Sequence, residues 1–217
     1  MTHTSQTRPL LEVAADLGLS SADLIPYGHD KAKLTPTRLQ LSGAKTGRLI
    51  LVSAINPTPA GEGKTTTAIG LSMGLRRIGK RALLALREPS LGPVFGAKGG
   101  GTGGGRASLS PADDINLHFT GDLHAITTAH NLLAALADNA VYYRQRFGDK
   151  GELDGRQLTF GRALDMNDRF LRRCVIGLGG KAHGSPREAR FDITAASEVM
   201  AVLALSTSYT DLATRLG

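Results

Sequence analysis

The predicted fold is decided by the stretch Thr58-Pro59-Ala60-Gly61-Glu62-Gly63-Lys64-Thr65. An apolar run over residues 49–52 precedes this stretch, and a segment with helical spacing follows it. A strand, a glycine-containing turn and a helix in this order are typical of a phosphate loop, because the turn and the helix N-terminus aim backbone N–H groups at one anion. The usual motif begins with Gly, and this chain has Thr58 there. We predict that the whole stretch binds phosphate groups; the alternative is a glycine-rich turn that carries a lysine by chance.

Two side chains at the end of this stretch have the chemistry that phosphoryl transfer requires. Lys64 can reach the terminal phosphates and offset their charge, so we predict a catalytic role for it. The Thr65 hydroxyl can hold Mg²⁺, which prefers oxygen ligands. Asp122 or Asp114 is predicted to complete the magnesium site through a water molecule. The expected ligand is therefore a nucleotide phosphate with Mg²⁺.

The segments on both sides of the phosphate loop predict an α/β fold of the P-loop NTPase type, with a parallel sheet flanked by helices. Residues 48–55 are predicted to form the first core strand, residues 65–78 a helix that Gly79 ends, and residues 82–86 a second strand. Short connections of this kind form a right-handed βαβ unit. The predicted apolar stripe of the helix consists of Ala68, Leu71, Leu75 and Ile78.

The remaining periodicity completes a single nucleotide-binding portion over 1–217, with three parts. Residues 1–47 hold a helix at 10–19 and a connector from residue 28. Residues 48–143 hold the phosphate loop, a glycine-rich loop and a helix at 124–141 whose apolar side is Ile126, Ala129, Leu133, Leu136 and Ala140. Residues 144–217 hold a polar excursion, a buried strand at 174–178, a basic loop at 179–190, a helix at 194–205 and a short helix ending near 216.

Arg87 and a run of glycines follow the second predicted strand. Ligands of parallel sheets bind beyond the carboxyl ends of the strands, so Arg87 is placed to clamp a carboxylate or phosphate with its planar fork. The alternative is an arginine on the surface. Lys98, Gly99 and Gly100 open the glycine run, whose successive N–H groups can form an anion-binding loop. A flexible linker is the alternative, but the apolar residues on both sides favour an ordered loop.

Composition limits the classes of partner and of site. The 217 residues carry a net charge of +7, which favours anionic ligands. Aromatic residues make up only 5% and Trp is absent, so nucleic-acid binding is not predicted. No apolar stretch is long enough to span a membrane, no secretion signal is visible, and the one cysteine, Cys174, is predicted to be buried and inert; we expect a cytoplasmic protein. His118, His124 and His130 are spaced by six, so they do not share a helix face or form a metal site.

Five stretches together closely resemble the formate–tetrahydrofolate ligase family, also called formyltetrahydrofolate synthetase. They are TPAGEGKTTTAIGLSMGL (58–75), REPSLGPVFGAKGG (87–100), DINLHFTGDLHAITTAHNLLAALADN (114–139), VIGLGGKAHGSPRE (175–188) and FDITAASEVMAVL (191–203). The resemblance follows the order of the chain and covers nearly all of it. It implies an enzyme, a ligase of one-carbon metabolism, that joins formate to tetrahydrofolate at the expense of ATP through formyl phosphate. It also assigns Arg87 to the formyl-phosphate site.

Two departures from the family pattern qualify this reading. The family's glycine run contains alanines and ends in Tyr, whereas this chain has Gly101-Thr102 and Arg106. Family members are also more than twice as long, so the resemblance covers their N-terminal part and implies an incomplete fold. The alternatives are a stand-alone ATP-binding or ATP-hydrolysing module without folate chemistry, and an inactive fragment that pairs with a separate C-terminal chain. A homo-oligomer or such a pairing is the expected assembly.

Overall fold

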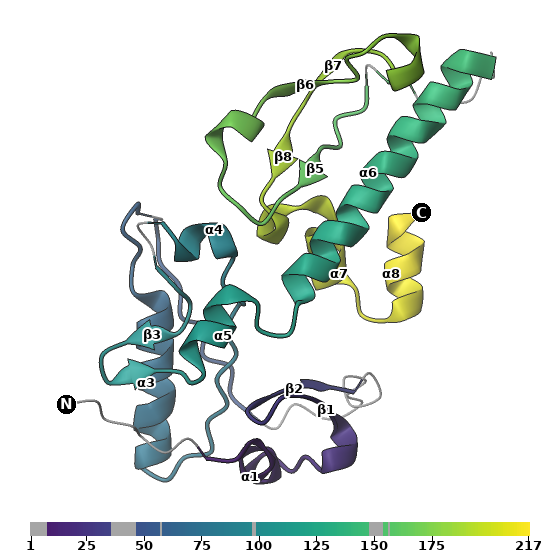
Figure 1. The fold of residues 1–217 in the computed structure, drawn as a ribbon. Helices are drawn as coiled ribbons and strands as arrows, with labels where there is room; N and C mark the ends of the chain where they lie inside the picture. Colours follow the sequence, from purple (N-terminus) through teal and green to yellow (C-terminus); the bar gives the residue numbers. More distant parts are fainter. Residues whose placement is uncertain (1–7, 36–46, 57, 97–98, 148–153, 156) are drawn as a thin grey trace. The chain divides into compact units, whose positions relative to one another are not determined.

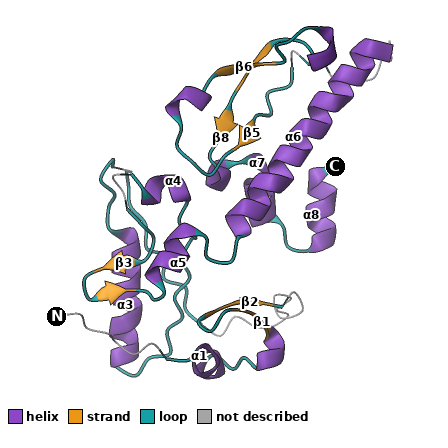
Figure 2. Ribbon diagram, in the orientation of Figure 1, coloured by secondary structure: helices purple, strands orange, loops and turns teal. Residues whose placement is uncertain are grey.

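The computed structural model describes residues 8–35, 47–56, 58–96, 99–147, 154–155 and 157–217. Contacts between Cα atoms divide the chain into two compact units, Met1–Thr120 and Gly121–Gly217. The division falls inside the predicted middle part, 48–143, at the start of its long helix. Figure 2 shows that helices and loops make up most of both units and that the strands are short.

The first unit consists of short helices, one long helix and two small hairpins (Figure 1). Its elements in chain order are α1 (Leu10–Asp16), a 3-10 turn (Ser21–Asp23), β1 (Leu24–Tyr27), β2 (Lys31–Leu34), α3 (Lys64–Arg77), α4 (Leu91–Val94), β3 (Gly103–Gly104), β4 (Ala107–Ser108) and α5 (Ala112–Leu117). β1 pairs antiparallel with β2, and β3 pairs antiparallel with β4. The β1–β2 hairpin overlaps the predicted connector, which is therefore partly wrong.

Helix α3 forms where the sequence predicts it, but its buried face differs. Ile69 is the buried residue, while Leu71 and Ile78 of the predicted stripe are 39% and 69% exposed. The β3–β4 hairpin packs on this side of the helix, and a Cβ atom at Gly70 would lie 3.7 Å from the Cβ atom of Ala107. The hairpin therefore covers the side of the helix that carries Ile69 and Gly70, which the predicted hydrophobic stripe does not include.

The two strands predicted around α3 are not present as strands in the described part of the first unit. Residues 48–55 and 82–86 run without a hydrogen-bonded neighbour strand, so the predicted parallel sheet is not confirmed. Burial nevertheless alternates residue by residue over 81–88, and again over 51–54. This period of two is typical of an extended chain with one covered face. Leu49, Leu51 and Leu83 are 94%, 83% and 75% exposed, so the other side is uncovered.

Ion pairs connect the outer elements of the first unit to its helices. Asp16 of α1 accepts hydrogen bonds from Arg8 at 2.7 Å and from Arg76 of α3 at 3.4 Å. The pKa of the Asp16 carboxyl is lowered, mostly by the hydrogen bond from Arg8 and next by the positive charge of Arg8. Lys31 of β2 pairs with Asp114 of α5, and this hydrogen bond raises the pKa of the Lys31 ammonium. These pairs connect α1 to α3 and β2 to α5 within the unit.

The second unit is built on one long helix (Figure 1). Its elements are α6 (Asp122–Phe147), β5 (Arg162–Ala163), a 3-10 turn (Arg169–Leu171), β6 (Cys174–Ile176), a 3-10 turn (Lys181–His183), β7 (Arg187–Ala189), β8 (Phe191–Asp192), a 3-10 turn (Thr194–Ala196), α7 (Glu198–Leu205) and α8 (Tyr209–Leu216). β5 pairs parallel with β8, and β6 pairs antiparallel with β7. The helix predicted at 194–205 is therefore a 3-10 turn followed by α7.

The buried face of α6 is partly polar, which the predicted apolar stripe missed. His130 is 1% exposed, whereas Leu136 of the predicted stripe is 55% exposed. His130 Nε2 lies 3.2 Å from the carbonyl oxygen of Gly161. The Asn131 carboxamide accepts from Ala163 N at 2.8 Å and donates to Ala163 O at 3.0 Å. These side chains satisfy the free backbone edge of β5, which is why polar residues are buried there.

β6 confirms the strand predicted at 174–178 but not its burial. Val175 and Leu178 are 59% and 66% exposed, and Cys174 is half-buried, with its Sγ 3.5 Å from the carbonyl oxygen of Ala189. The strand belongs to a two-stranded hairpin, which covers only one face. Among the helices of the described residues, none combines the length and apolar character needed to cross a membrane.

Candidate phosphate-binding site

Thr58 closes the turn of the phosphate loop. Its hydroxyl donates to the carbonyl oxygen of Gly61 at 3.2 Å, and the amide of Gly61 donates to the carbonyl oxygen of Thr58 at 3.1 Å. Gly61 has φ +82° and Gly63, the N-cap of α3, has φ +68°. Both values lie in the left-handed region that glycine adopts without strain. The departure from the usual motif at Thr58 is thus compatible with a closed turn.

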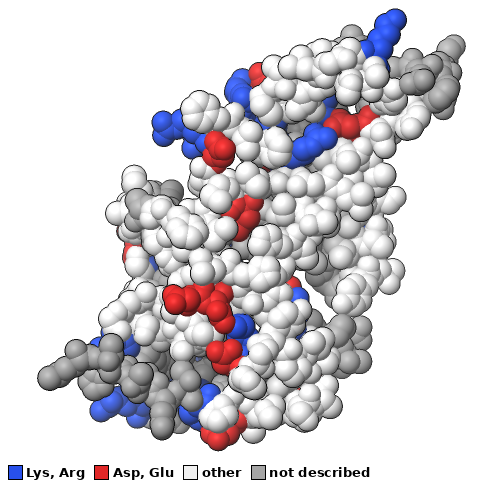
Figure 3. Space-filling model, in the orientation of Figure 1, with Lys and Arg blue, Asp and Glu red and all other residues white. Residues whose placement is uncertain are grey.

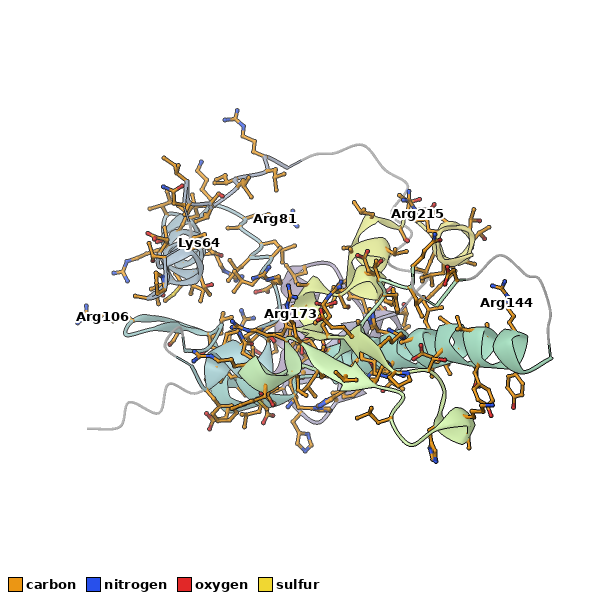
Figure 4. All side chains as sticks on the ribbon, turned by 90° about the horizontal axis from the view of Figure 1, so that it is seen from above. Lys64, Arg81, Arg106, Arg144, Arg173 and Arg215 are labelled. Carbon is orange, nitrogen blue, oxygen red and sulfur yellow. The ribbon has the colours of Figure 1, made fainter. Side chains whose placement is uncertain are left out.

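The space in front of the phosphate loop is open. A Cβ atom added at Gly61 or Gly63 would meet nothing within 4 Å. Lys64 is the first residue of α3 and is exposed, as Figure 4 shows from above. α3 has 14 residues, so its N-terminus carries the partial positive charge of a full helix dipole. The turn and helix form as predicted; only the strand before them does not.

Arg87 is carried by the extended segment that ends in Pro89 and Ser90. The Arg87 side chain lies on the exposed side of the alternating stretch, and Ser90 is buried, with 8% exposure. A Cβ atom at Gly101 would lie 2.9–3.1 Å from the side chain of Pro89. The segment with Arg87 is therefore in close contact with the glycine-rich run, and its predicted role in binding a carboxylate or phosphate remains a prediction.

The glycine-rich run is folded from Gly99 onward, while Lys98 lies outside the described residues. Gly99 N donates to Gly96 O at 3.3 Å, and Gly101 N donates to Asn116 Oδ1 at 2.8 Å. Gly100 is exposed between them. The ordered loop is confirmed over the linker alternative. Its role as an anion-binding loop remains a prediction, and two of its amides already donate within the chain.

Asn116 and Thr102 are the residues of this region that the sequence analysis missed. Asn116 Nδ2 donates to Thr102 Oγ1 at 3.2 Å, and Thr102 is 7% exposed. Asn116 lies in the long family-like stretch 114–139, but no local pattern marks it as a contact of the glycine run. The buried Thr102 hydroxyl is thus satisfied by the carboxamide of Asn116.

The predicted magnesium ligands Thr65 and Asp122 lie in two different units of the chain. Thr65 belongs to the first unit and Asp122 to the second, so their joint role remains a prediction. Within the described residues, no group of three or more His, Cys, Asp or Glu side chains could hold a metal ion. His130 packs against Phe160 with ring centroids 4.3 Å apart, which makes it a core residue of the second unit.

The second unit contains a cavity of about 600 Å³ that none of the predicted site residues lines. Asp138 lies at its wall and pairs with Arg162 at 2.8 Å and with Arg187. One carboxylate thus holds two guanidinium groups together.

Figure 3 shows acidic and basic side chains interspersed in small groups on the face it presents, in agreement with the scattered charge of the sequence.

Comparison with known proteins gives one consistent result. The family profile described as "Formate--tetrahydrofolate ligase" matches residues 1–217. Proteins with this same name are 63% identical over 210 residues in Myxococcus xanthus, 57% over 211 residues in Rhizobium etli and 56% over 214 residues in Paracoccus denitrificans. These alignments cover 97–98% of this chain but only 37–38% of each relative. The phosphate loop, the Arg87 segment and the glycine run all lie within this match, and the chain belongs to the formate–tetrahydrofolate ligase family.

Proposed function

We propose that this chain is the phosphate-binding part of an enzyme that ligates formate to tetrahydrofolate with ATP. The observation that carries the proposal is the open phosphate loop at the start of α3, in a chain whose whole length matches the ligase family. The chain spans little more than a third of the relatives it matches, so the complete reaction is assigned to a longer protein or an assembly.

The proposed chemistry has two steps. A carboxylate oxygen of formate attacks the γ-phosphorus of ATP, ADP leaves, and formyl phosphate forms. The amine nitrogen of tetrahydrofolate then attacks the formyl carbon, inorganic phosphate leaves, and the nitrogen loses its proton. Lys64 and the loop amides offset charge on the transferring phosphoryl group. The planar fork of Arg87 holds the carboxylate or the phosphate of the intermediate. Water must be excluded, because the mixed anhydride would otherwise hydrolyse.

We also propose that residues 48–55 and 82–86 become strands of a P-loop-like parallel sheet when another segment lies beside them. The alternating burial of 81–88 and the exposed Leu49, Leu51 and Leu83 support this. The neighbouring strand would come from the remaining part of a longer ligase or from a separate C-terminal chain. A homo-oligomer is the other predicted assembly. Mg²⁺ bound with ATP would take the Thr65 hydroxyl as a ligand, and Asp122 through water; the cytoplasm stays the predicted location.

The experiment compares the 217-residue chain with the same chain joined to the remaining segment of the Myxococcus xanthus relative. Both are incubated with ATP, formate and tetrahydrofolate, and formyltetrahydrofolate is assayed. We expect product from the joined protein and none from the short chain, because orienting both substrates supplies several orders of magnitude in rate. Absence of product from the joined protein would contradict the proposed function.

Arg87→Lys in the joined protein tests the formyl-phosphate role. The change keeps the charge but loses the bidentate geometry, so formate-dependent turnover should fall much more than ATP affinity. Arg81→Lys is the matched control, since Arg81 is an exposed arginine of the same segment. An equal fall of turnover and ATP affinity would assign Arg87 to the nucleotide site or to the fold.

A stand-alone ATP-binding or ATP-hydrolysing module is the second candidate. One observation favours it. The turn of the phosphate loop is held by its own hydrogen bonds, and the space around Gly61 and Gly63 is empty. ATP hydrolysis by the 217-residue chain at a rate independent of formate would support it. Neither hydrolysis nor ATP binding by the short chain, together with activity of the joined protein, would leave it as one partner of a split enzyme.

A further inference from the structure

Asn116 forms a two-point contact with the glycine-rich run. Its Oδ1 accepts from the amide of Gly101 at 2.8 Å, and its Nδ2 donates to the hydroxyl of Thr102 at 3.2 Å. The orientation of the carboxamide follows from the partner, because the backbone N–H of Gly101 can only donate. Both contacts are partly buried, so water competes little for them.

The fit around this contact is close on two sides. A Cβ atom at Gly100 would overlap the carboxamide of Asn116, and one at Gly101 would press on the side chain of Pro89. Neither glycine has a positive φ, so space and not backbone conformation requires glycine here. The glycine run therefore lies between Asn116 on one side and the end of the Arg87 segment on the other.

Both ends of this arrangement are anchored within the first unit. The helix α5, which carries Asn116, is tied to β2 by the pair between Lys31 and Asp114. The Lys31 side chain is only 12% exposed. At the other end, a Cβ atom at Gly103 would lie 2.7 Å from Cδ1 of Ile69 in α3. α3 begins at Lys64, so the chain of contacts runs from Asn116 to the helix of the phosphate loop.

We infer that Asn116 is a positioning residue, whose carboxamide holds the glycine-rich run against Pro89 and thereby sets where Arg87 lies relative to the phosphate loop. This inference rests on the proposed function. The phosphate loop itself makes its closing contacts within 58–61, and Asn116 takes part in neither of these hydrogen bonds. Loss of the carboxamide should therefore disturb the step that uses Arg87 more than it disturbs nucleotide binding.

The test uses three variants and one control. Asn116→Ala removes both hydrogen bonds, Thr102→Val removes the hydroxyl with little change of shape, and Thr102→Ser retains it. Asn131→Ala is the matched control, because Asn131 also makes two hydrogen bonds to one backbone position, but in the second unit. If Asn116→Ala and Asn131→Ala lose a similar amount of thermal stability, a change of the Arg87 signals in Asn116→Ala alone reflects positioning and not a general effect on folding.

The first readout is taken on the 217-residue chain by amide NMR and hydrogen exchange. We expect Asn116→Ala to remove the exchange protection of Gly101 and to shift the amide signals of Arg87 and Glu88, with smaller shifts in Thr102→Val. Thr102→Ser and Asn131→Ala should leave these signals in place. Unshifted Arg87 and Glu88 signals in a folded Asn116→Ala protein overturn the inference; if that variant does not fold, Thr102→Val decides by the same criterion.

The second readout is kinetic and uses the joined protein described above. Asn116→Ala should lower kcat about ten-fold while the KM for ATP changes less than about two-fold, since small misplacements of a reacting group cost one to two orders of magnitude. Equal effects on kcat and on the KM for ATP contradict the inference. An inactive parent protein contradicts the proposed function instead, and the NMR readout still decides whether Asn116 places the Arg87 segment.

Discussion

Gly61 and Gly63 of the phosphate loop and Gly100 and Gly101 of the glycine-rich run are glycines for different physical reasons. In the phosphate loop, Gly61 and Gly63 have positive φ and empty space around the missing Cβ atom. In the glycine-rich run, Gly100 and Gly101 have ordinary φ but no room for a side chain. The first pair needs an unusual backbone and has open surroundings, whereas the second pair allows neighbouring parts of the protein to approach. Glycine content alone does not distinguish a ligand loop from a packed one.

Gly103→Ala should have the largest effect, because Gly103 combines both reasons. Its φ is +77°, and a Cβ atom would overlap Ala107 O and lie 2.7 Å from Ile69 Cδ1. We expect the free energy of unfolding to fall by about 3 kcal/mol, from strain and overpacking together. Urea denaturation measures it. Gly104→Ala is the control, since nothing lies within 4 Å there; equal losses in both variants would show that the hairpin is not tightly packed.

Lys64→Ala should have the next largest effect, and on binding alone. The exposed Lys64 has no structural role at the first position of α3, so circular dichroism should not change. Affinity for ATP should fall at least about ten-fold, because a charge near the terminal phosphates is lost. Lys80→Ala, an exposed lysine just past the other end of the helix, is the control. Unchanged affinity in folded Lys64→Ala would remove the phosphate-loop assignment.

Gly61→Ala isolates the conformational reason from the packing reason. The site is open, so only the left-handed φ of +82° opposes a side chain, and we expect a loss of about 1 kcal/mol in stability. ATP affinity should fall as well, because the turn must relax. Gly74→Ala inside α3 is the control and should raise stability slightly, since alanine favours helix and the site is open. A loss at Gly61 as large as that at Gly103 would erase the distinction between the two segments.

The smallest effect concerns Asp16, which pairs with Arg8 and Arg76 outside the phosphate loop and the glycine-rich run. Its folded-state pKa is lowered by Arg8, so its stabilising contribution is present above the unfolded pKa of about 4 and is lost as pH falls through the folded pKa. Asp16→Asn should lower Tm slightly at pH 7, and the difference from the parent should vanish in acid. Calorimetry at both pH values checks this. ATP affinity at pH 7 should not change; a change would mean that α1 also positions the phosphate loop.

Local patterns were sufficient to predict the turn and the helices of this protein. The N-cap glycine, the helical spacing and Gly79 place α3 to within one residue at each end, and α8 ends where expected. What the patterns could not supply is the packing direction. The hairpin at Gly103 covers the Ile69 side of α3, and the His130 imidazole and the Asn131 carboxamide occupy a face predicted to be apolar. Both outcomes depend on a partner far away in the sequence.

The strands predicted at 48–55 and 82–86 are not formed, for a related reason. An apolar run such as 49–52 indicates a strand, but a strand exists only beside another strand that accepts and donates its backbone hydrogen bonds. The described residues offer no such neighbour to this run. The candidate site followed the same division: Lys64 and Arg87 were visible because their motifs are local, whereas Asn116 acts on residues 14 to 15 positions away.

The alternating burial of residues 81–88 limits which strand could join this protein. If a neighbouring strand slipped by one residue, its apolar side chains would turn to the opposite face of the pair. They would then no longer lie on the same side as the partly covered Val52 and Ala54, or would no longer cover the exposed Leu83. Slips are therefore allowed only in steps of two, and each such step also changes which backbone groups meet. An added strand would have to match the two-residue alternation of residues 81–88, and a random apolar peptide would match it poorly. Recognition of a strand that joins here would thus depend on register as well as on hydrophobicity.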